Sequence, residues 1–353
     1  MRLVYLANSR IPSSTANSIH VMRMCNAFAQ LGHQVHLIAP LQAARSSEPF
    51  DVFSHYGVPN SFRIHHPSSV DLPFGKKRLY AAKMVQTAAT LVPDLVYARS
   101  LSAALIAARQ GFPVYYELHH LPEQDHPLVA AVKALRVYIE ARRRKYRLGD
   151  QRLLELSEIG ALSDPVQMFE QLVSSPNLVC ASTITRALKS AVLARYPELD
   201  QRIRVAPDGA DPSPKDILPA RLQGPQQKLT VGYTGQLYPG KGIELIPDLA
   251  KLCPWATFHI VGGNARELAY WRKKLRNAKN VYLYGSVPPT DVRKYIRAVD
   301  VCLLPNQPQM YAHSLKRKSG AEIGKYTSPL KLFEYMAEGK AIVASDLDVI
   351  MEI

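Results

Sequence analysis

The residues with the clearest chemical potential lie near the end of the chain, in the segment 327–340. Ser328 and Pro329 are residue types that begin helices, and Gly339 is a type that ends them. The pattern therefore predicts a helix with Ser328 as its N-cap and Pro329 at its first position. The first N–H groups of a helix have no partner within it and carry the positive end of its dipole, so this segment offers a site for an anion.

Two charged side chains distinguish this predicted helix from an ordinary one. Lys331 lies with Leu330 in the first turn, where a cation opposes the dipole. That placement disfavours helix stability and suits a grip on a phosphate. Glu334 follows one turn later and can accept hydrogen bonds from the two hydroxyls of a ribose. An ordinary amphipathic helix would explain the cap alone, but the cap, the lysine and the glutamate together favour a nucleotide-phosphate site.

A second segment, 231–242, joins a predicted strand to a glycine-containing loop. Gly235 lets the backbone approach a diphosphate closely, and Gln236 is the next residue of the same candidate phosphate-binding loop. Lys241, flanked by glycines, supplies a charge-assisted contact. The loop does not match the Walker motif, because Gly242 stands where that motif has Ser or Thr. A tight turn between a strand and a helix is the alternative interpretation.

A histidine in the first half follows a predicted strand. His119 comes soon after the apolar run 114–116, so we expect it at the carboxyl end of a parallel strand, where ligands bind. An imidazole there can contact a sugar hydroxyl or a departing phosphate, which makes His119 the candidate catalytic residue. The chain has 11 histidines, so a chance position at a strand end is the competing interpretation.

Small polar residues precede the first long helix. The predicted loop 13–18, which includes Asn17 and Ser18, is expected to turn backbone N–H groups toward the same ligand as His119. The family resemblance described below implies that this ligand is the acceptor or the sugar. A plain loop between a strand and a helix would have the same composition. The sequence therefore marks this loop as a candidate without deciding its role.

Short apolar runs alternate with longer helical patterns, which is typical of parallel βαβ units. The runs predicted as strands are 3–6, 35–38, 95–97, 114–116, 178–181, 203–205, 229–233, 257–261, 281–284, 301–304 and 341–344. The segment 207–227 is rich in proline and has no periodicity, which predicts a hinge. We therefore expect an α/β protein with two Rossmann-like domains, 1–206 and 228–353, that face each other across a cleft.

Length and composition limit the class of protein. With 353 residues, 47% hydrophobic and 21% charged, the chain exceeds the usual size of one core and does not have the composition of a disordered protein. The start does not have the pattern of a signal peptide, and no apolar run reaches the roughly 18 residues of a membrane span. The four cysteines are scattered without a Cys-x-x-Cys pair, which predicts reduced thiols, no metal site and a cytoplasmic location.

The net charge of +15 points to an anionic partner, such as nucleic acid, a membrane surface or a phosphorylated substrate. The basic cluster, defined here as Arg142, Arg143, Arg144 and Lys145, shares its segment with apolar side chains. We expect it to bind the anionic inner face of the cell membrane, and a solvated helix face is the alternative. Nucleic acid is not expected, because no aromatic platform or recognition motif accompanies the cluster.

Taken in order, these segments resemble the retaining glycosyltransferases of family 4, also called group 1. The resemblance runs over nearly the whole chain and rests on the segments 27–35, 94–99, 116–119, 205–211, 235–242, 258–263, 301–305 and 329–346. It implies the GT-B fold, with an acceptor-binding domain before the hinge and a nucleotide-sugar-binding domain after it. It also implies transfer of a hexose-type sugar to an acceptor hydroxyl with retention, in surface polysaccharide or glycolipid synthesis.

The same resemblance implies roles for individual residues. It puts Lys241 on the diphosphate, Glu334 on the ribose, the turn 328–331 at the phosphates and His119 at the reacting centre. In this family the acceptor attacks the face from which the leaving group departs, and the leaving phosphate takes the acceptor proton. Lysines and a helix N-terminus can stabilise the developing negative charge, so no metal and no cofactor besides the donor are expected.

Three features depart from the family pattern. Tyr326 occupies the position of the first glutamate in the paired acidic motif, which affects recognition of the donor sugar. Gln236 stands where an arginine is common, so one positive contact to the diphosphate is missing. The chain stops at Ile353, just into a helix, which predicts an incomplete C-terminal domain. A catalytically silent nucleotide-sugar-binding homologue is the alternative that these departures favour.

Overall fold

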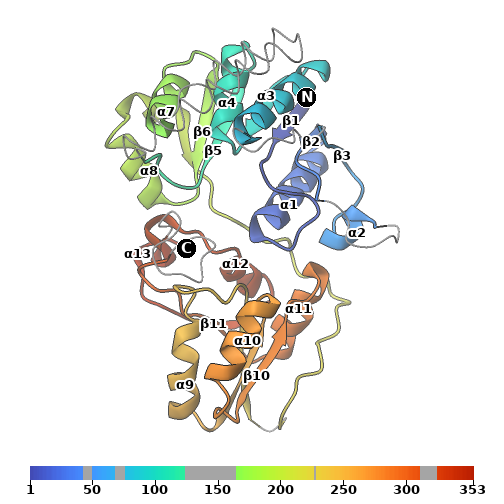
Figure 1. The fold of residues 1–353 in the computed structure, drawn as a ribbon, viewed down its shortest axis with the longest axis vertical. Helices are drawn as coiled ribbons and strands as arrows, with labels where there is room; N and C mark the ends of the chain where they lie inside the picture. The colour runs from blue at the N-terminus through green and yellow to red at the C-terminus, as the bar shows by residue number, and fades with distance from the viewer. Residues whose placement is uncertain (43–49, 68–75, 124–163, 226–227, 311–323) are drawn as a thin grey trace. The chain divides into compact units, whose positions relative to one another are not determined.

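Figure 1 shows the chain as a computed structural model, which describes residues 1–42, 50–67, 76–123, 164–225, 228–310 and 324–353. Contacts divide the chain into two units. The first unit comprises Met1–Thr183 and Lys189–Val205, and the second comprises Ile184–Leu188 and Ala206–Ile353. Each unit contains a sheet of its own, and every strand pair within both sheets is parallel.

The sheet of the first unit has seven strands in the order β3-β2-β1-β4-β5-β6-β7. Their bounds are β1 (Arg2–Leu6), β2 (Gln34–Ile38), β3 (Arg63–His65), β4 (Leu95–Ala98), β5 (Val114–Leu118), β6 (Leu178–Thr183) and β7 (Ile203–Val205). In β1 every residue from Leu3 to Leu6 is buried, as expected for a strand covered on both faces. The strands predicted in this half are confirmed, and β3 is an edge strand whose short, half-polar sequence does not predict it.

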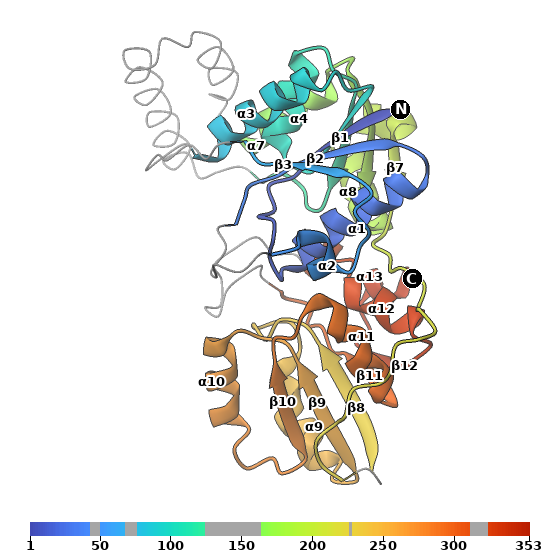
Figure 2. The same cartoon turned by 90° about the vertical axis from the view of Figure 1, so that its right-hand side faces the viewer.

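Helices cover this sheet. Their bounds are α1 (Ala16–Gln30), α2 (Val52–Tyr56), α3 (Lys76–Thr90), α4 (Leu101–Arg109), α7 (Pro165–Val173) and α8 (Arg186–Leu193), with a 3-10 helix over Pro197–Arg202. The helices α3, α4 and α7 pack side by side (Figures 1 and 2). On α1, Val21, Met22 and Cys25 are buried in one core with β1 and β2. All four cysteines are free thiols, as predicted.

The sheet of the second unit has five strands in the order β10-β9-β8-β11-β12. Their bounds are β8 (Leu229–Thr234), β9 (Ala256–Val261), β10 (Val281–Gly285), β11 (Val301–Leu304) and β12 (Ala341–Ala344), which confirms the predicted strands. Figure 2 shows β10, β9 and β8 side by side. The helices are α9 (Ile246–Leu252), α10 (Ala265–Lys274), α11 (Pro289–Ala298), α12 (Leu330–Ala337) and α13 (Asp348–Met351), with 3-10 turns over Ile243–Leu245 and Gly324–Tyr326.

Both sheets have a point where the order of the strands reverses. It lies between β1 and β4 in the first unit and between β8 and β11 in the second. At such a point the two connecting segments leave the sheet in opposite directions, and ligands of open parallel sheets bind beyond the carboxyl ends of these strands. We therefore expect ligand-binding residues after β8 and β11 in the second unit and after β1 and β4 in the first.

The predicted hinge 207–227 lies against the second unit over its described part. Arg293 on α11 donates to the main-chain oxygens of Asp211 and Pro212, at 2.6 and 2.9 Å. Arg297 donates to three further main-chain oxygens of the same segment, those of Pro214, Lys215 and Ile217. These contacts give the carbonyl groups partners that proline-rich sequence cannot supply itself, and they make the segment part of the second unit.

The second unit also takes in residues 184–188, which the sequence prediction placed in the N-terminal domain. The carboxylate of Glu352 accepts hydrogen bonds from the N–H groups of Arg186 and Ala187, at 2.5 and 2.8 Å. These are the first N–H groups of α8, which have no partner within the helix. A residue near the end of the chain therefore completes the start of a helix more than 160 positions earlier.

Candidate active site

The predicted phosphate site lies where β8 ends and α12 begins. Tyr335 on α12 accepts a hydrogen bond from the N–H of Thr234, the last residue of β8, with 2.9 Å between nitrogen and oxygen. Tyr335 is fully buried. Its hydroxyl therefore fixes α12 against the carboxyl end of β8.

Lys331 lies one turn before Tyr335, and its ammonium group is buried. The Nζ atom stands 3.8 Å from the centre of the Tyr233 ring and has no hydrogen-bond partner among the described residues. Gly235 has φ +135°, a backbone conformation that favours glycine, and a Cβ there would be in contact with Nζ at 3.4 Å. Burial lowers the pKa of Lys331 well below its usual value, and the charge of Lys241 lowers it further.

Lys241 lies in the loop between β8 and α9. Burial lowers its pKa from 10.5 to about 8. The loop is held by Glu244, whose carboxylate accepts a hydrogen bond from the Gly240 N–H at 2.6 Å. Two lysines whose positive charge is costly in the folded protein thus stand close enough to repel each other. An anion between them and the N-terminus of α12 would offset both costs.

One prediction about this turn is wrong: Ser328 is not the N-cap of α12. Pro329 takes that position, without a side-chain cap from any described residue. The Ser328 hydroxyl instead accepts a hydrogen bond from the Asp208 N–H at 3.1 Å. The Leu332 N–H donates to the Pro329 oxygen at 2.8 Å, and no described side chain caps the N–H groups before it, which suits an anion better than the predicted cap does.

The remaining predicted donor residues surround this turn. Leu330 and Glu334 are half-buried on α12, with Glu334 three positions after Lys331. Gln236 is exposed, and its main-chain oxygen accepts a hydrogen bond from the Tyr233 hydroxyl at 2.7 Å. The structure thus brings Gly235, Lys331 and the start of α12 together.

A second cluster lies in the first unit, around Glu117 on β5. This carboxylate is 4% exposed and accepts hydrogen bonds from the hydroxyls of Tyr97 and Tyr5, at 2.8 and 3.1 Å. The Arg99 Nε atom is 3.5 Å away. Burial by itself raises the pKa of Glu117, but Arg99 and hydrogen bonds from two histidines outweigh it and bring the pKa well below its usual value. The group is therefore a buried carboxylate that keeps its charge.

The two histidines on this carboxylate include the predicted catalytic residue. The Nε2 atoms of His119 and His20 lie 2.5 and 3.0 Å from Glu117 Oε1. The Nη2 atom of Arg99 is 3.4 Å from His119 Nδ1. Since arginine only donates, Nδ1 accepts here and Nε2 carries the proton toward Glu117. Sequence reasoning found His119 and missed Glu117 and His20; the signal was a carboxylate inside an apolar strand, two residues before the histidine.

The predicted polar loop 13–18 is shorter than expected, because α1 already begins at Ala16. The side chain of Thr15 caps the helix by accepting from the Ser18 N–H. Ser18 is fully buried, and its hydroxyl donates to the main-chain oxygens of Ser13 and Thr15. Its N–H and hydroxyl are thus used within the turn, so the expectation that Ser18 offers them to a ligand is wrong. Asn17 is exposed in the first turn of α1.

Several expectations fall elsewhere. The basic cluster, residues 142–145, lies outside the described residues. Within the described ranges, no three or more His, Cys, Asp and Glu residues are arranged to hold a metal ion. None of the described helices has both the length and the apolar composition needed to span a membrane.

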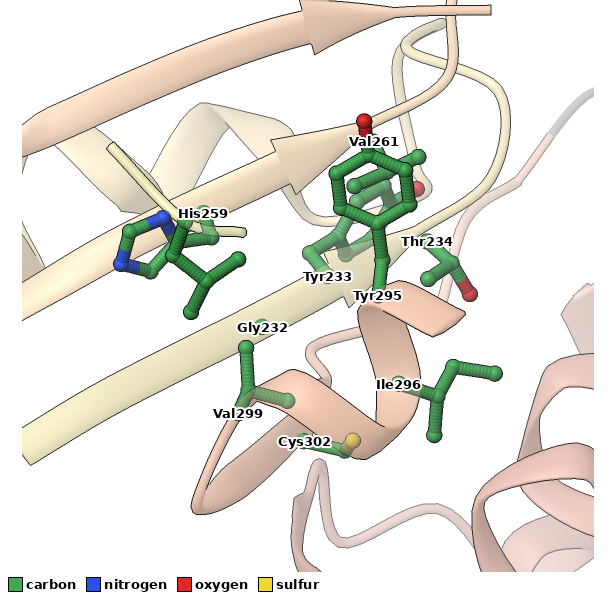
Figure 3. Close-up of a pocket in the computed structure, with 10 residues that line it drawn as sticks. Gly232, Tyr233, Thr234, His259, Val261, Tyr295, Ile296, Val299 and Cys302 are labelled. Carbon is green, nitrogen blue, oxygen red and sulfur yellow. The ribbon is translucent and has the colours of Figure 1, made fainter. Parts of the chain in front are cut away.

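Figure 3 shows the residues that line a small space between β8 and α11. Its lining is mainly apolar and includes Tyr233, Ile296 and Cys302. It has room for about one water molecule. A Cβ at Gly232 would lie 2.7 Å from the Val299 side chain, so the space is a packing gap beside a close contact between helix and strand.

Two family models match the chain. Residues 18–155 match the model described as Glycosyltransferase Family 4. Residues 228–353 match the model described as Glycosyl transferases group 1. The two models fall on the two halves of the chain in the order expected from the sequence motifs.

A curated relative is similar to part of the chain. The chain is 28% identical over 126 residues to a protein of Bacillus subtilis (strain 168) that carries the name teichuronic acid biosynthesis glycosyltransferase TuaH. The match covers 36% of this chain and 28% of the relative. The similarity thus spans less than a third of the length of that protein.

Solved structures match over the whole chain. HepE of Anabaena, solved with UDP and glucose, is 17% identical with a TM-score of 0.59, covering 100% of this chain and 82% of that chain. A sucrose-phosphate synthase of Thermosynechococcus elongatus is 16% identical with a TM-score of 0.62, covering 98% of this chain and 81% of that chain. At this identity the likeness shows the fold, which is the GT-B type predicted. Fold, motif order and both family models agree, and the chain belongs to the group 1, or family 4, glycosyltransferases.

Proposed function

We propose that this protein transfers a sugar from a nucleoside-diphosphate donor to an acceptor hydroxyl with retention of the anomeric configuration. One observation carries the proposal: Lys241 and Lys331, both with a lowered pKa, stand near the uncapped N-terminus of α12. A diphosphate supplies the negative charge that this arrangement favours, and a sugar is the group that a glycosyltransferase moves from it.

The donor is held mainly by the second unit. Lys241 and Lys331 bind the diphosphate together with the turn 328–331, and Glu334 accepts hydrogen bonds from the ribose hydroxyls. HepE was solved with UDP-glucose, which supports a nucleotide sugar as the donor class. A uridine nucleotide is accordingly the first donor to test.

The reaction follows from where charge develops. The bond between the sugar C1 and the diphosphate oxygen breaks, and a bond from C1 to the acceptor oxygen forms on the same face. The acceptor proton moves to the leaving phosphate. Positive charge from Lys241, Lys331 and the α12 N-terminus stabilises the diphosphate as it leaves, so the step requires no metal ion. His119, which Glu117 orients, is the candidate catalytic residue of the first unit.

The acceptor is a growing surface polysaccharide or a glycolipid. The relationship to TuaH supports a polysaccharide acceptor. We propose a cytoplasmic protein that binds the inner face of the membrane through the basic cluster, where each lysine or arginine adds about 1 kcal/mol of attraction. A lipid-linked acceptor would be found at that surface.

Calorimetric titration with UDP, GDP, ADP and dTDP, followed by assays of sugar transfer and donor hydrolysis, tests the proposal. We expect one nucleoside diphosphate to bind and its sugar conjugate to turn over. Binding without any turnover would favour the catalytically silent homologue, to which Tyr326 and Gln236 point. Failure of every nucleoside diphosphate to bind would contradict both functions.

A further inference from the structure

One neutral side chain in the second unit is buried without using its polar atoms. Asn306 is 0% exposed, and neither its amide nitrogen nor its amide oxygen has a hydrogen-bond partner among the described residues. Buried polar groups in folded proteins are nearly always paired, because an unpaired one loses its hydration without compensation. An amide with both atoms unpaired among the described residues therefore has hydrogen-bonding capacity that a ligand could use.

Asn306 lies at the point where strand order reverses in the second sheet. It comes two residues after the end of β11, and β11 pairs with β8 there. The flanking residues touch the loop that carries Lys241. The Gln307 N–H donates to the Gly240 oxygen at 2.9 Å, and a Cβ at Gly242 would lie 2.0 Å from the Pro305 oxygen. The unpaired amide is thus next to the proposed diphosphate site.

The hydrogen-bonding capacity of an amide distinguishes between the diphosphate and the sugar of the donor as its binding partner. A phosphate oxygen accepts hydrogen bonds and does not donate, so it would pair Nδ2 and leave Oδ1 unsatisfied. A sugar hydroxyl both donates and accepts, so hydroxyls can satisfy both atoms. The neutral side chain also adds nothing to the charge that binds the diphosphate, which the two lysines supply.

We propose that Asn306 is a specificity residue that binds hydroxyl groups of the transferred sugar. This inference rests on the proposed function and adds to it the residue that recognises the sugar. Because a polar pocket rejects analogues that leave its groups unpaired, Asn306 would favour sugars with hydroxyls at the matching positions.

The test compares two ligands on two variants of the full chain. Wild type is titrated with UDP, GDP, ADP and dTDP, then with the glucose, galactose, mannose and N-acetylglucosamine conjugates of the nucleotide that binds. Asn306→Leu keeps the volume and removes both polar atoms. We expect it to raise the Kd of the tightest conjugate about tenfold, while the Kd of the free nucleoside diphosphate changes by less than about twofold.

The neighbouring amide is the matched control. Gln307 Nε2 already donates to the Pro305 oxygen at 2.9 Å, so Gln307→Ala should leave both Kd values unchanged. Asn306→Leu should also keep or raise the melting temperature of the free protein, because it removes an unpaired polar group from the interior. This readout shows that the variant is folded.

Two results overturn the inference. If Asn306→Leu weakens the free diphosphate and the conjugate equally, the residue does not discriminate the sugar. If it weakens neither, the residue does not bind the donor. Failure of wild type to bind any nucleoside diphosphate refutes the proposed function instead, and that outcome is visible before any variant is made.

Discussion

Replacing Lys331 by methionine tests two effects of its buried charge: lower stability of the free protein and higher affinity for a nucleoside diphosphate. The Nζ atom lies 3.8 Å from the Tyr233 ring centre with no described hydrogen-bond partner, so methionine fills the same space without a charge. A hydrogen bond between charged groups contributes about 1.5–3 kcal/mol. At about 1.4 kcal/mol per factor of ten, the Kd for a nucleoside diphosphate should rise roughly 10- to 150-fold.

The same substitution should stabilise the free protein. A lysine whose pKa is lowered on folding destabilises the native state at pH values below its unfolded pKa, because the native state binds its proton less well. Lys331→Met removes this penalty, so its melting temperature at pH 7 should exceed that of wild type. The advantage should shrink as the pH rises toward the ordinary pKa of lysine, where wild type loses the charge in both states.

Isothermal titration calorimetry and thermal unfolding of the two proteins check both effects. Lys340→Met is the matched control, since Lys340 Nζ donates to the main-chain oxygens of Arg297 and Val299, both at 2.8 Å. The control should lower the melting temperature and leave the Kd unchanged. An unchanged Kd in Lys331→Met, or a loss of stability as large as in the control, would refute the reasoning about this site.

Three further predictions concern pH, the carboxylate cluster and the membrane. Because the pKa of Lys241 is lowered to about 8, the Kd for a nucleoside diphosphate should rise between pH 7 and 9, and binding near pH 8 should take up protons in calorimetry across buffers; no uptake would contradict this. Glu117→Gln should lower kcat up to about 100-fold because His119 is then misplaced, and an unchanged kcat argues against the positioning role. The ionised Glu117 stabilises wild type above the unfolded pKa of about 4.3, and this contribution is lost as the pH falls below that value. The variant should lack this contribution at every pH. Neutralising the four residues of the basic cluster should release the protein from anionic vesicles without changing nucleotide affinity, and persistent vesicle binding would exclude that cluster.

The fold was predictable because burial on both faces makes parallel strands visible as apolar runs. Leu3 to Leu6 is such a run, and β1 occupies it. Arg63–His65 lacks this property, because an edge strand of three residues has little to bury. Local sequence therefore indicates the central strands and leaves the edges undetermined.

The site residues that lie close together in the sequence could be predicted. Those whose partners lie far away in the sequence could not. The lysine and the helix start come from one short segment, so the anion site could be read from it. Glu117 receives its hydrogen bonds from Tyr5 and Tyr97, which are 112 and 20 positions away. Ser328 was misassigned for the same reason, since its partner Asp208 is 120 positions away.

The contact of Glu352 with the start of α8 determines where this protein can be divided. The border between the units runs through one helix, with Arg186–Leu188 on one side and Lys189–Leu193 on the other. A fragment that begins at Ala206 would leave the Glu352 carboxylate without the two N–H groups that it binds. It would also lack Ala187, which packs against the core formed by Leu332 and Val349. A cut at residue 206 would therefore remove residues of α8 that the second unit contains.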